Sequence, residues 1–345
     1  MMKLRTLALP AIATLTIALA GCQDGTRENV RAVGSSTVLP FAELVAEMTA
    51  RANPGAGTPI IEGIGSGAGI QLFCQGTGAS TPDIANASRR MKLSEFETCQ
   101  RNGVQEITEI QVGLDGIVFV STAGGITMNL TPKIVYEALA ASPYGEEQTN
   151  ETWSDVDPSL PDVPILVYGP PPTSGTRDAL KELVLEAGCD TDPRMEALAE
   201  SDEDRHGQVC TEVRNDGKFV EGGEQDNLII QKISNNRNAV GVLGYSFLEK
   251  NAGRVQGLPV NGFEPTYENI SNFSYPGARP LYIYVKNAHL QAIPGLRSYV
   301  EEWSKNWGPD GALAARGLVA SDAEKRAANL EKATSFTPLT ADELS

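Results

Sequence analysis

Residues 30–40, Val-Arg-Ala-Val-Gly-Ser-Ser-Thr-Val-Leu-Pro, decide the fold. The apolar run at 30–33 is typical of a short buried strand. The spacing of Phe41, Val45 and Met48 indicates a helix directly after it. Glycine, two serines and a threonine fill the turn between them. A strand that leads through a polar turn into a helix is the building unit of α/β layers.

Two further segments repeat this design. Gly63-Ile-Gly-Ser-Gly-Ala-Gly69 ends a predicted strand at 59–64, and Ser174-Gly-Thr-Arg177 follows a predicted strand at 164–168. Other segments read as strands at 84–87, 104–110, 116–121, 239–243 and 281–285, as helices at 131–141, 174–187, 227–233 and most of 295–334, and as loops at 142–162 and 190–215. The sequence therefore predicts an α/β fold.

The three corners between strand and helix favour the binding of an anion. A helix N-terminus offers unpaired backbone N–H groups and about half a positive charge. Hydroxyls add neutral donors, and glycine lets the backbone approach a ligand closely. One such corner alone would indicate only a helix cap. Three in one chain, with Arg89 and Arg177 at the same strand ends, indicate an oxyanion site.

The first residues indicate export. Lys3 and Arg5 precede a short apolar run, and Leu19-Ala-Gly-Cys22 closes it. This pattern predicts a signal peptide at 1–21, a lipidated Cys22 and a tether at 22–29, so we expect a periplasmic protein that is lipid-anchored to a bacterial membrane. The alternative is ordinary signal cleavage beside an incidental Cys22.

Four cysteines remain, an even number in an oxidising compartment, and three pairings are possible. We favour Cys74–Cys99 and Cys189–Cys210, because each pair closes a loop inside one local segment. A zinc site is the alternative, but the chain has no Cys-x-x-Cys spacing and only two histidines. We therefore expect no metal.

Composition and motifs exclude several functions. A formal net charge of −16 disfavours nucleic acid as a partner, because such binding needs a basic surface. No Gly-Lys-Ser/Thr phosphate loop and no Gly-x-Ser-x-Gly motif occur, so no cofactor and no enzymatic activity are expected. The two histidines, His206 and His289, are not placed to activate a serine.

Here the ordered motifs carry a resemblance. The segments 34–40, 65–69, 83–89, 173–177 and 239–245 resemble, in order and near spacing, the phosphate-binding protein of bacterial phosphate ABC transporters. The resemblance implies a two-lobed type II periplasmic binding protein, with a mixed sheet flanked by helices in each lobe and the ligand in the cleft between them. Lobe I would comprise 30–112 and 281–345, and lobe II 113–280.

The resemblance also implies the ligand contacts. They map onto Ser36, Thr37, Val38, Leu39, Ser66, Gly67, Ser88, Arg89, Ser174, Gly175, Thr176 and Arg177. Hydroxyls and the backbone N–H groups near Val38, Leu39, Gly67 and Gly175 would donate hydrogen bonds, while Arg89 and Arg177 would supply charge from opposite lobes.

This chain departs from the best-known branch of the family at two points. That branch has an aspartate at the position of Arg89, which accepts the proton of hydrogen phosphate, and an arginine where this chain has prolines 170–172. Asp115 is the candidate replacement for the proton acceptor, or simply a turn residue before a strand.

The expected function is to bind inorganic phosphate in the periplasm and deliver it, as a monomer, to the permease of an ABC transporter. The alternatives are a secreted phosphate-ester hydrolase, a protein that binds sulfate or another oxyanion, and a surface role in attachment or sensing.

Overall fold

The computed structural model describes residues 29–344 except 56, 173 and 224–225. The predicted signal peptide, Cys22 and all but the last residue of the predicted tether lie outside the described residues. Within the described part of the chain, no helix has the length and apolar character needed to cross a bilayer.

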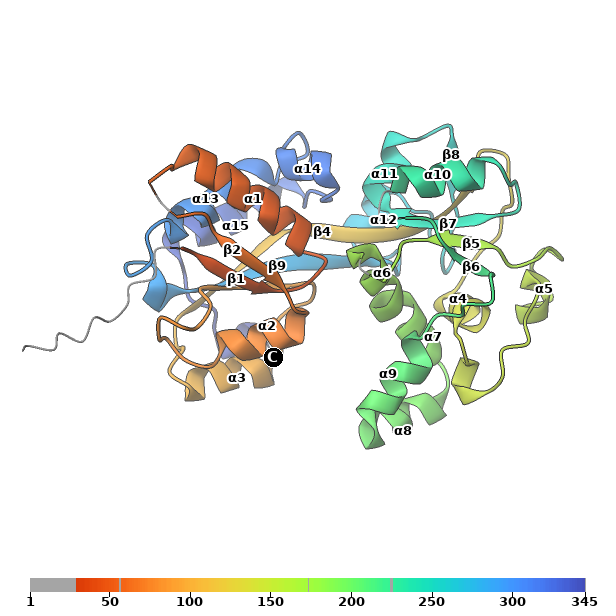
Figure 1. Cartoon of the computed structure of the whole chain (residues 1–345), viewed down its shortest axis with the longest axis horizontal. Helices are drawn as coiled ribbons and strands as arrows, with labels where there is room; N and C mark the ends of the chain where they lie inside the picture. Colours follow the sequence, from red (N-terminus) through yellow and green to blue (C-terminus); the bar gives the residue numbers. More distant parts are fainter. Residues whose placement is uncertain (1–28, 56, 173, 224–225, 345) are drawn as a thin grey trace, which may run out of the picture.

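Two strands that run between two lobes organise the molecule (Figure 1). They are β4 (Ile107–Thr122) and β9 (Ala278–Lys286), which pair antiparallel along most of the length of β9. The complete strand order is β2-β1-β3-β9-β4-β7-β5-β6, and β8 also pairs with β4. Each lobe therefore builds its sheet on one end of β4.

Lobe I contains three short parallel strands, β1 (Arg31–Gly34), β2 (Ile60–Gly63) and β3 (Ile84–Ala87). Alternate residues of β9 enter two separate cores: Leu281, Ile283 and Val285 pack in one, Tyr282 and Tyr284 in the other. Side chains alternate between the faces of a strand, so the sheet is covered on both faces. Its helices are α1 (Leu39–Ala52), α2 (Ser66–Phe73), α3 (Leu93–Arg101), α13 (Leu296–Asn306), α14 (Ala312–Arg316) and α15 (Ala323–Ser335), with short 3-10 turns η3 (Asn287–His289) and η4 (Ala341–Leu344).

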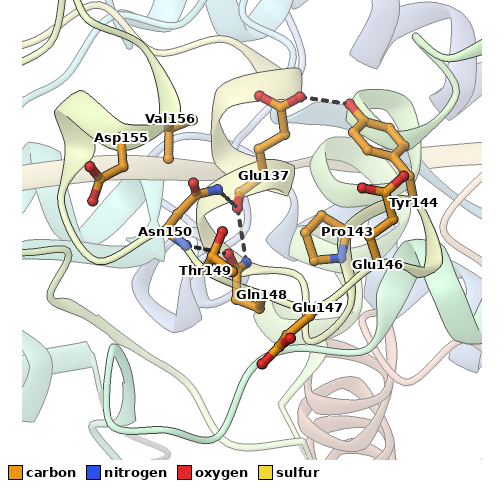
Figure 2. Close-up of a pocket in the computed structure, with 10 residues that line it drawn as sticks. All are labelled: Glu137, Pro143, Tyr144, Glu146, Glu147, Gln148, Thr149, Asn150, Asp155 and Val156. Atoms are coloured by element: carbon orange, nitrogen blue, oxygen red, sulfur yellow. Dashed lines mark hydrogen bonds between the residues drawn. The ribbon is translucent and has the colours of Figure 1, made fainter.

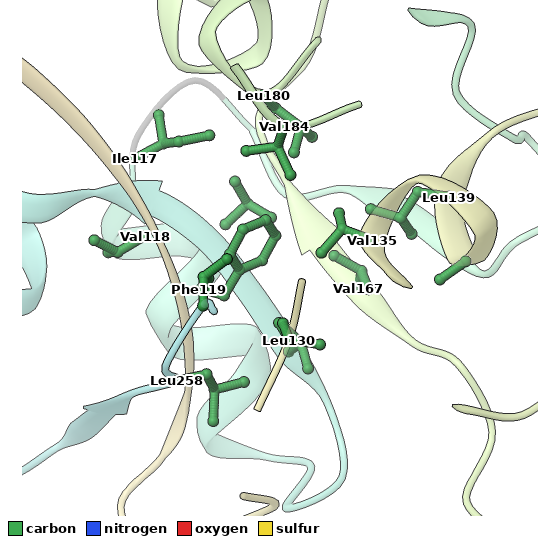
Figure 3. Close-up of a cluster of buried hydrophobic side chains, with 14 of the residues drawn as sticks. Ile117, Val118, Phe119, Leu130, Val135, Leu139, Val167, Leu180, Val184 and Leu258 are labelled. Atoms are coloured by element: carbon green, nitrogen blue, oxygen red, sulfur yellow. The ribbon is translucent and has the colours of Figure 1, made fainter. Parts of the chain in front are cut away.

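Lobe II contains β5 (Val167–Gly169), β6 (Phe219–Glu221), β7 (Val240–Gly244) and β8 (Val255–Gly257). Figure 3 shows its core, where Phe119 of β4 lies among aliphatic side chains that include Leu130 and Leu180. Its helices are α4 (Pro132–Leu139), α5 (Trp153–Val156), α6 (Gly175–Leu180), α7 (Glu186–Cys189), α8 (Pro193–Ser201), α9 (Glu203–Thr211), α10 (Asp226–Ser234), α11 (Tyr245–Lys250) and α12 (Tyr267–Ser271), with the 3-10 turn η1 (Pro143–Gly145) and the π-helical turn η2 (Lys181–Leu185).

Two sequence-based expectations were wrong. Residues 104–110 and 116–121 are not separate strands, because β4 continues through the glycines between them with a register shift between Gln111 and Gly113. A Cβ on Gly113 would lie 2.7 Å from Leu318, so this glycine makes room for a neighbouring side chain rather than ending the strand. Residues 190–215 are largely helical, because Asp192 and Asp202 cap α8 and α9.

Both favoured disulfides are present. Cys74–Cys99 joins the end of α2 to α3, with 4.3 Å between the two Cα atoms. Cys189–Cys210 joins α7 to α9, with 5.4 Å between the Cα atoms. The same two cysteines gather with Asp190 and His206 into a group of potential metal ligands. Because both sulfurs are in the disulfide, neither is available as the thiolate that zinc requires.

Candidate functional site

The first corner, residues 34–39, connects β1 to α1 and is closed by Ser35. The Ser35 hydroxyl accepts hydrogen bonds from the backbone N–H groups of Thr37 (3.2 Å) and Val38 (3.3 Å), and its carbonyl accepts one from Leu39 (3.0 Å). The N–H groups of Val38 and Leu39, which were predicted to donate to the ligand, thus already donate within the turn in this structure. The hydroxyl of Thr37 remains as a donor at this corner, whereas that of Ser36 interacts with Asp178 of lobe II.

The second corner, residues 63–66, connects β2 to α2 and lies against the first corner and the end of β3. Ser66 Oγ accepts a hydrogen bond from the backbone N–H of Ser88 and lies 3.1 Å from Ser88 Oγ. A Cβ on Gly69 would lie 2.4 Å from the Cα of Gly34, so only glycine allows α2 to pack this closely on the first corner. Ser66 and Ser88 thus share one surface with the first corner.

The third corner lies in lobe II, where Ser174 caps α6 and its Oγ accepts a hydrogen bond from the backbone N–H of Thr176 (3.3 Å). It touches the first corner directly, because Thr37 Oγ1 lies 3.5 Å from the carbonyl oxygen of Gly175. The first corner of lobe I and the third corner of lobe II therefore meet between the lobes.

Arg177 is buried on the lobe II side of this contact. Its Nη1 donates to the carbonyl oxygen of Pro170 (3.1 Å), and its guanidinium lies 4.4 Å from the centre of the Phe219 ring. Only 6% of the residue is exposed, and its Nε has no hydrogen-bond partner among the residues that the structure describes. Among the described residues no carboxylate lies within 4 Å of it, and burial lowers the pKa of Arg177. It is a buried cation that lacks a close anionic partner in this part of the chain.

Arg89 lies next to the second corner, since a Cβ on Gly67 would be 3.7 Å from its Nη2. Its charge is not free, because Nη1 and Nη2 donate to the two Glu95 oxygens at 2.9 and 2.7 Å. Burial works against the ionised Glu95, but hydrogen bonds from Arg89 and the Lys92 backbone outweigh it, so the pKa of Glu95 is lowered. Arg89, which was expected to supply charge to the ligand, thus forms an ion pair with Glu95 beside the corner.

Sequence reasoning missed Arg279, at the start of β9. It is 4% exposed and donates from Nη2 to Thr37 Oγ1 at 2.7 Å, from Nη1 to Glu182, and from Nε to Asp115 at 3.4 Å. Asp115 lies on β4, and burial raises its pKa although the Arg279 charge opposes the shift. The only signal in the sequence was the position of Arg279 just before the predicted strand at 281–285.

Asp178 was also missed. It lies in α6 of lobe II, is half-buried, and accepts a hydrogen bond from Ser36 of lobe I. Burial raises the pKa of Asp178, and the neighbouring Glu182 raises it further. This carboxyl group therefore adds an acceptor beside corners that otherwise present donors.

A separate pocket of about 290 Å³ lies in lobe II (Figure 2). It is lined by residues between 137 and 156, among them the carboxylates of Glu137, Glu146, Glu147 and Asp155. Because like charges repel, this acidic pocket is unsuited to an anion, and the converging corners are the better candidate site.

The comparison with protein families agrees with this geometry. A model described as the PBP superfamily domain matches residues 22–305. The chain belongs to the PBP superfamily.

Several curated proteins are similar to this PBP superfamily member along most of their length. Protein SphX of Synechococcus elongatus is 31% identical over 315 residues, which is 88% of this chain and 82% of that protein. The phosphate-binding protein PstS of Staphylococcus saprophyticus is 27% identical, over 79% of this chain and 74% of that protein. A possible phosphate-binding protein of Planctomyces limnophilus has a similar structure, with a TM-score of 0.71, 22% identity, and coverage of 89% of this chain and 98% of that one. This structural likeness establishes the two-lobed type II fold.

Proposed function

We propose that this chain binds inorganic phosphate in the cleft between its lobes and delivers it to the permease of an ABC transporter. The observation that carries the proposal is the contact between Thr37 and Gly175, which brings hydroxyl-bearing corners of the two lobes together. Relatives of 27–28% identity that are named phosphate-binding proteins support the choice of phosphate.

The proposed contacts follow the predicted ones, with changed roles for Ser36, Val38, Leu39 and Arg89, and with the candidate acceptor Asp115 paired to Arg279. Hydroxyls of Thr37, Ser66, Ser88, Ser174 and Thr176 donate, together with backbone N–H groups near Gly67 and Gly175, and the hydroxyl of Ser36 is shared with Asp178. Arg177 supplies charge. Its Nε is buried and has no hydrogen-bond partner in the described part of the chain, which supports this role. Val38 and Leu39 shape the first corner without donating hydrogen bonds to the anion. Arg89 contributes as part of its ion pair with Glu95.

The proposed boundaries place 30–112 and 281–345 in lobe I and 113–280 in lobe II. Separate hydrophobic cores, one in lobe II and two in lobe I, support this division, because different parts of β4 pack in the cores of the two lobes. Val319 is the exception, because it bridges to Leu114 and packs in the lobe II core. Two linking strands suit a hinge, so we propose that phosphate closes the lobes and that the closed form docks on the permease.

The remaining proposals concern the state of the protein in the cell. We propose that it is a periplasmic monomer held at a membrane by lipid on Cys22. The basic start, the apolar run and Leu19-Ala-Gly-Cys22 support this. Mass spectrometry of the mature protein tests it: an N-terminal peptide that begins at an acylated Cys22 is expected, and an unmodified cysteine contradicts it.

Isothermal titration of protein refolded free of bound ligand tests the main proposal. One phosphate per chain with micromolar or tighter affinity is expected, and no heat at micromolar concentrations contradicts phosphate binding. A chromogenic phosphate ester tests the alternative of hydrolysis. We expect no turnover, because His206 is bonded to Asp190, and His289 to Asp83 and Thr77, rather than to a serine of the corners.

A further inference from the structure

Arg279 connects three elements that the hinge must keep in register. Its guanidinium contacts Asp115 of β4, Glu182 of η2 in lobe II, and Thr37 in the first corner of lobe I. The side chain is 4% exposed, and 242 residues separate Arg279 from Thr37. A residue at the start of β9 therefore fixes a ligand-facing hydroxyl of lobe I with respect to lobe II.

The contact with Thr37 determines how that hydroxyl can bond. A threonine hydroxyl has one proton to donate and two lone pairs to accept with. Because Arg279 Nη2 donates to Thr37 Oγ1 at 2.7 Å, the hydroxyl accepts on that side and its proton points elsewhere. On its other side the hydroxyl lies 3.5 Å from the carbonyl oxygen of Gly175, which is long for a hydrogen bond. The proton is thus available to an acceptor that enters the cleft.

The charges around Arg279 show why it acts through Thr37 rather than as a free cation. Asp115 and Glu182 each pair with its guanidinium, so its positive charge is compensated. Asp178 also lies near Arg279 and Glu182, and Arg89 faces Glu182 from lobe I. Asp115 and Glu182 hold the Arg279 side chain in place, and Arg279 in turn fixes the orientation of the Thr37 hydroxyl.

We propose that Arg279 is a positioning residue for the bound anion, which keeps the Thr37 hydroxyl directed into the cleft as a donor. This inference rests on the proposed binding of phosphate at the corners. It assigns a role to an arginine that the sequence pattern did not single out. A purely structural ion pair would stabilise the hinge without being coupled to Thr37 in ligand affinity.

A double-mutant cycle separates these two roles. Arg279→Gln, Thr37→Val and the double variant are titrated with inorganic phosphate, beside the wild-type protein. Each single change should weaken phosphate binding about 10- to 100-fold, the size expected for a lost charge-assisted hydrogen bond. The double variant should be little weaker than either single one, because both changes remove the same hydrogen bond to phosphate.

Arg214 provides the matched control. It is also 4% exposed and paired with a carboxylate, Asp216, but its other contacts are backbone carbonyls of lobe II, Ala138 and Asn150. Arg214→Gln should lower the melting temperature and leave the phosphate affinity unchanged. Arg279→Lys keeps the charge without the three-pronged contact, so its affinity should fall between those of wild type and Arg279→Gln, and it serves if Arg279→Gln does not fold.

The outcomes are distinguishable. If wild type binds phosphate but Arg279→Gln and Arg279→Lys bind it equally well, or if the effects of Arg279 and Thr37 simply add, the positioning role is overturned and the proposed function stands. If wild type itself gives no phosphate heat, the proposed function fails and the inference falls with it.

Discussion

Gly175 of lobe II and Thr37 of lobe I are in direct contact, with the Thr37 hydroxyl 3.5 Å from the Gly175 carbonyl oxygen, although 138 residues separate them in the sequence. A Cβ added to Gly175 would lie 2.7 Å from the Cα of Thr37, closer than real Cβ atoms approach other atoms. Gly175 has no positive φ, so the turn itself does not demand glycine here. Glycine is needed at position 175 because the two lobes approach each other so closely there.

The first prediction is that Gly175→Ala weakens phosphate binding by at least about 10-fold, or about 1.4 kcal/mol, because the two corners can no longer meet. Lobe stability should change little, since the added methyl group clashes only between lobes. Gly207→Ala is the matched control: Gly207 is inside α9, and its Cβ would meet open space. That change should stabilise the protein by about 0.4–1 kcal/mol without affecting affinity. Wild-type affinity in Gly175→Ala would contradict the proposed closure.

The second prediction concerns Arg177. Arg177→Met should weaken phosphate binding by at least about 30-fold, or about 2 kcal/mol, because a desolvated anion loses its buried cation. Without phosphate, the variant should be as stable as wild type or more so, since no described carboxylate within 4 Å compensates the guanidinium. Thermal unfolding with and without phosphate measures both effects. A variant that is stabilised by phosphate as strongly as wild type would remove Arg177 from the site.

The sequence could predict those features that depend on neighbouring residues. Strand, polar turn and helix follow one another at Gly34, Gly63 and Gly169, so the three corners were visible as local patterns. The pairing of Cys189 with Cys210 was accessible for the same reason, since only 21 positions separate them. The continuity of β4 was not accessible, because its glycines resemble a break between two strands. Only the structure shows that Gly113 makes room for the side chain of Leu318.

The sequence could not show which polar groups of the corners are already bonded. Val38 and Leu39 were predicted as backbone donors, but Ser35, inside the same turn, accepts from both N–H groups. Arg279 and Asp178 reach the site through contacts with Thr37 and Ser36 of the other lobe. Such long-range contacts leave no spacing pattern, and a single arginine in a sequence is usually a surface group.

The third prediction concerns the Cys189–Cys210 disulfide, which ties α7 to α9 on the arm of lobe II that Figure 1 shows extending from α6. Replacing both cysteines by alanine should lower the free energy of unfolding by about 3 kcal/mol, because the unfolded chain loses a cross-link. Phosphate affinity should be unchanged.

The Cys74–Cys99 double alanine variant is the comparison: it loosens α2, which carries Ser66, so both stability and affinity should fall. Urea unfolding and titration separate the two results, and equal losses of affinity would contradict this assignment.

Asp178 gives the cleft a dependence on pH. Burial and the neighbouring Glu182 raise its pKa, while the hydrogen bond from Ser36 opposes the shift. As the pH falls through this raised pKa, the carboxyl group becomes neutral, stops repelling an anion and gains a proton to donate. Lys181 and Arg279 are the positive groups that face it.

The fourth prediction uses sulfate, whose charge does not change between about pH 5 and pH 9, so that any change in binding reports on the protein. In a direct titration, sulfate should bind more tightly as the pH falls, because the ionised Asp178 repels an anion that has no proton to offer. Asp178→Asn should bind sulfate more tightly at neutral pH and with a flatter pH profile, since its amide is uncharged throughout.

Glu186→Gln is the control. Burial also raises the pKa of Glu186, but this residue lies further along the same helical stretch, in α7, so the wild-type slope should persist. A wild-type slope retained in Asp178→Asn would show that another group, such as Asp115, governs selectivity.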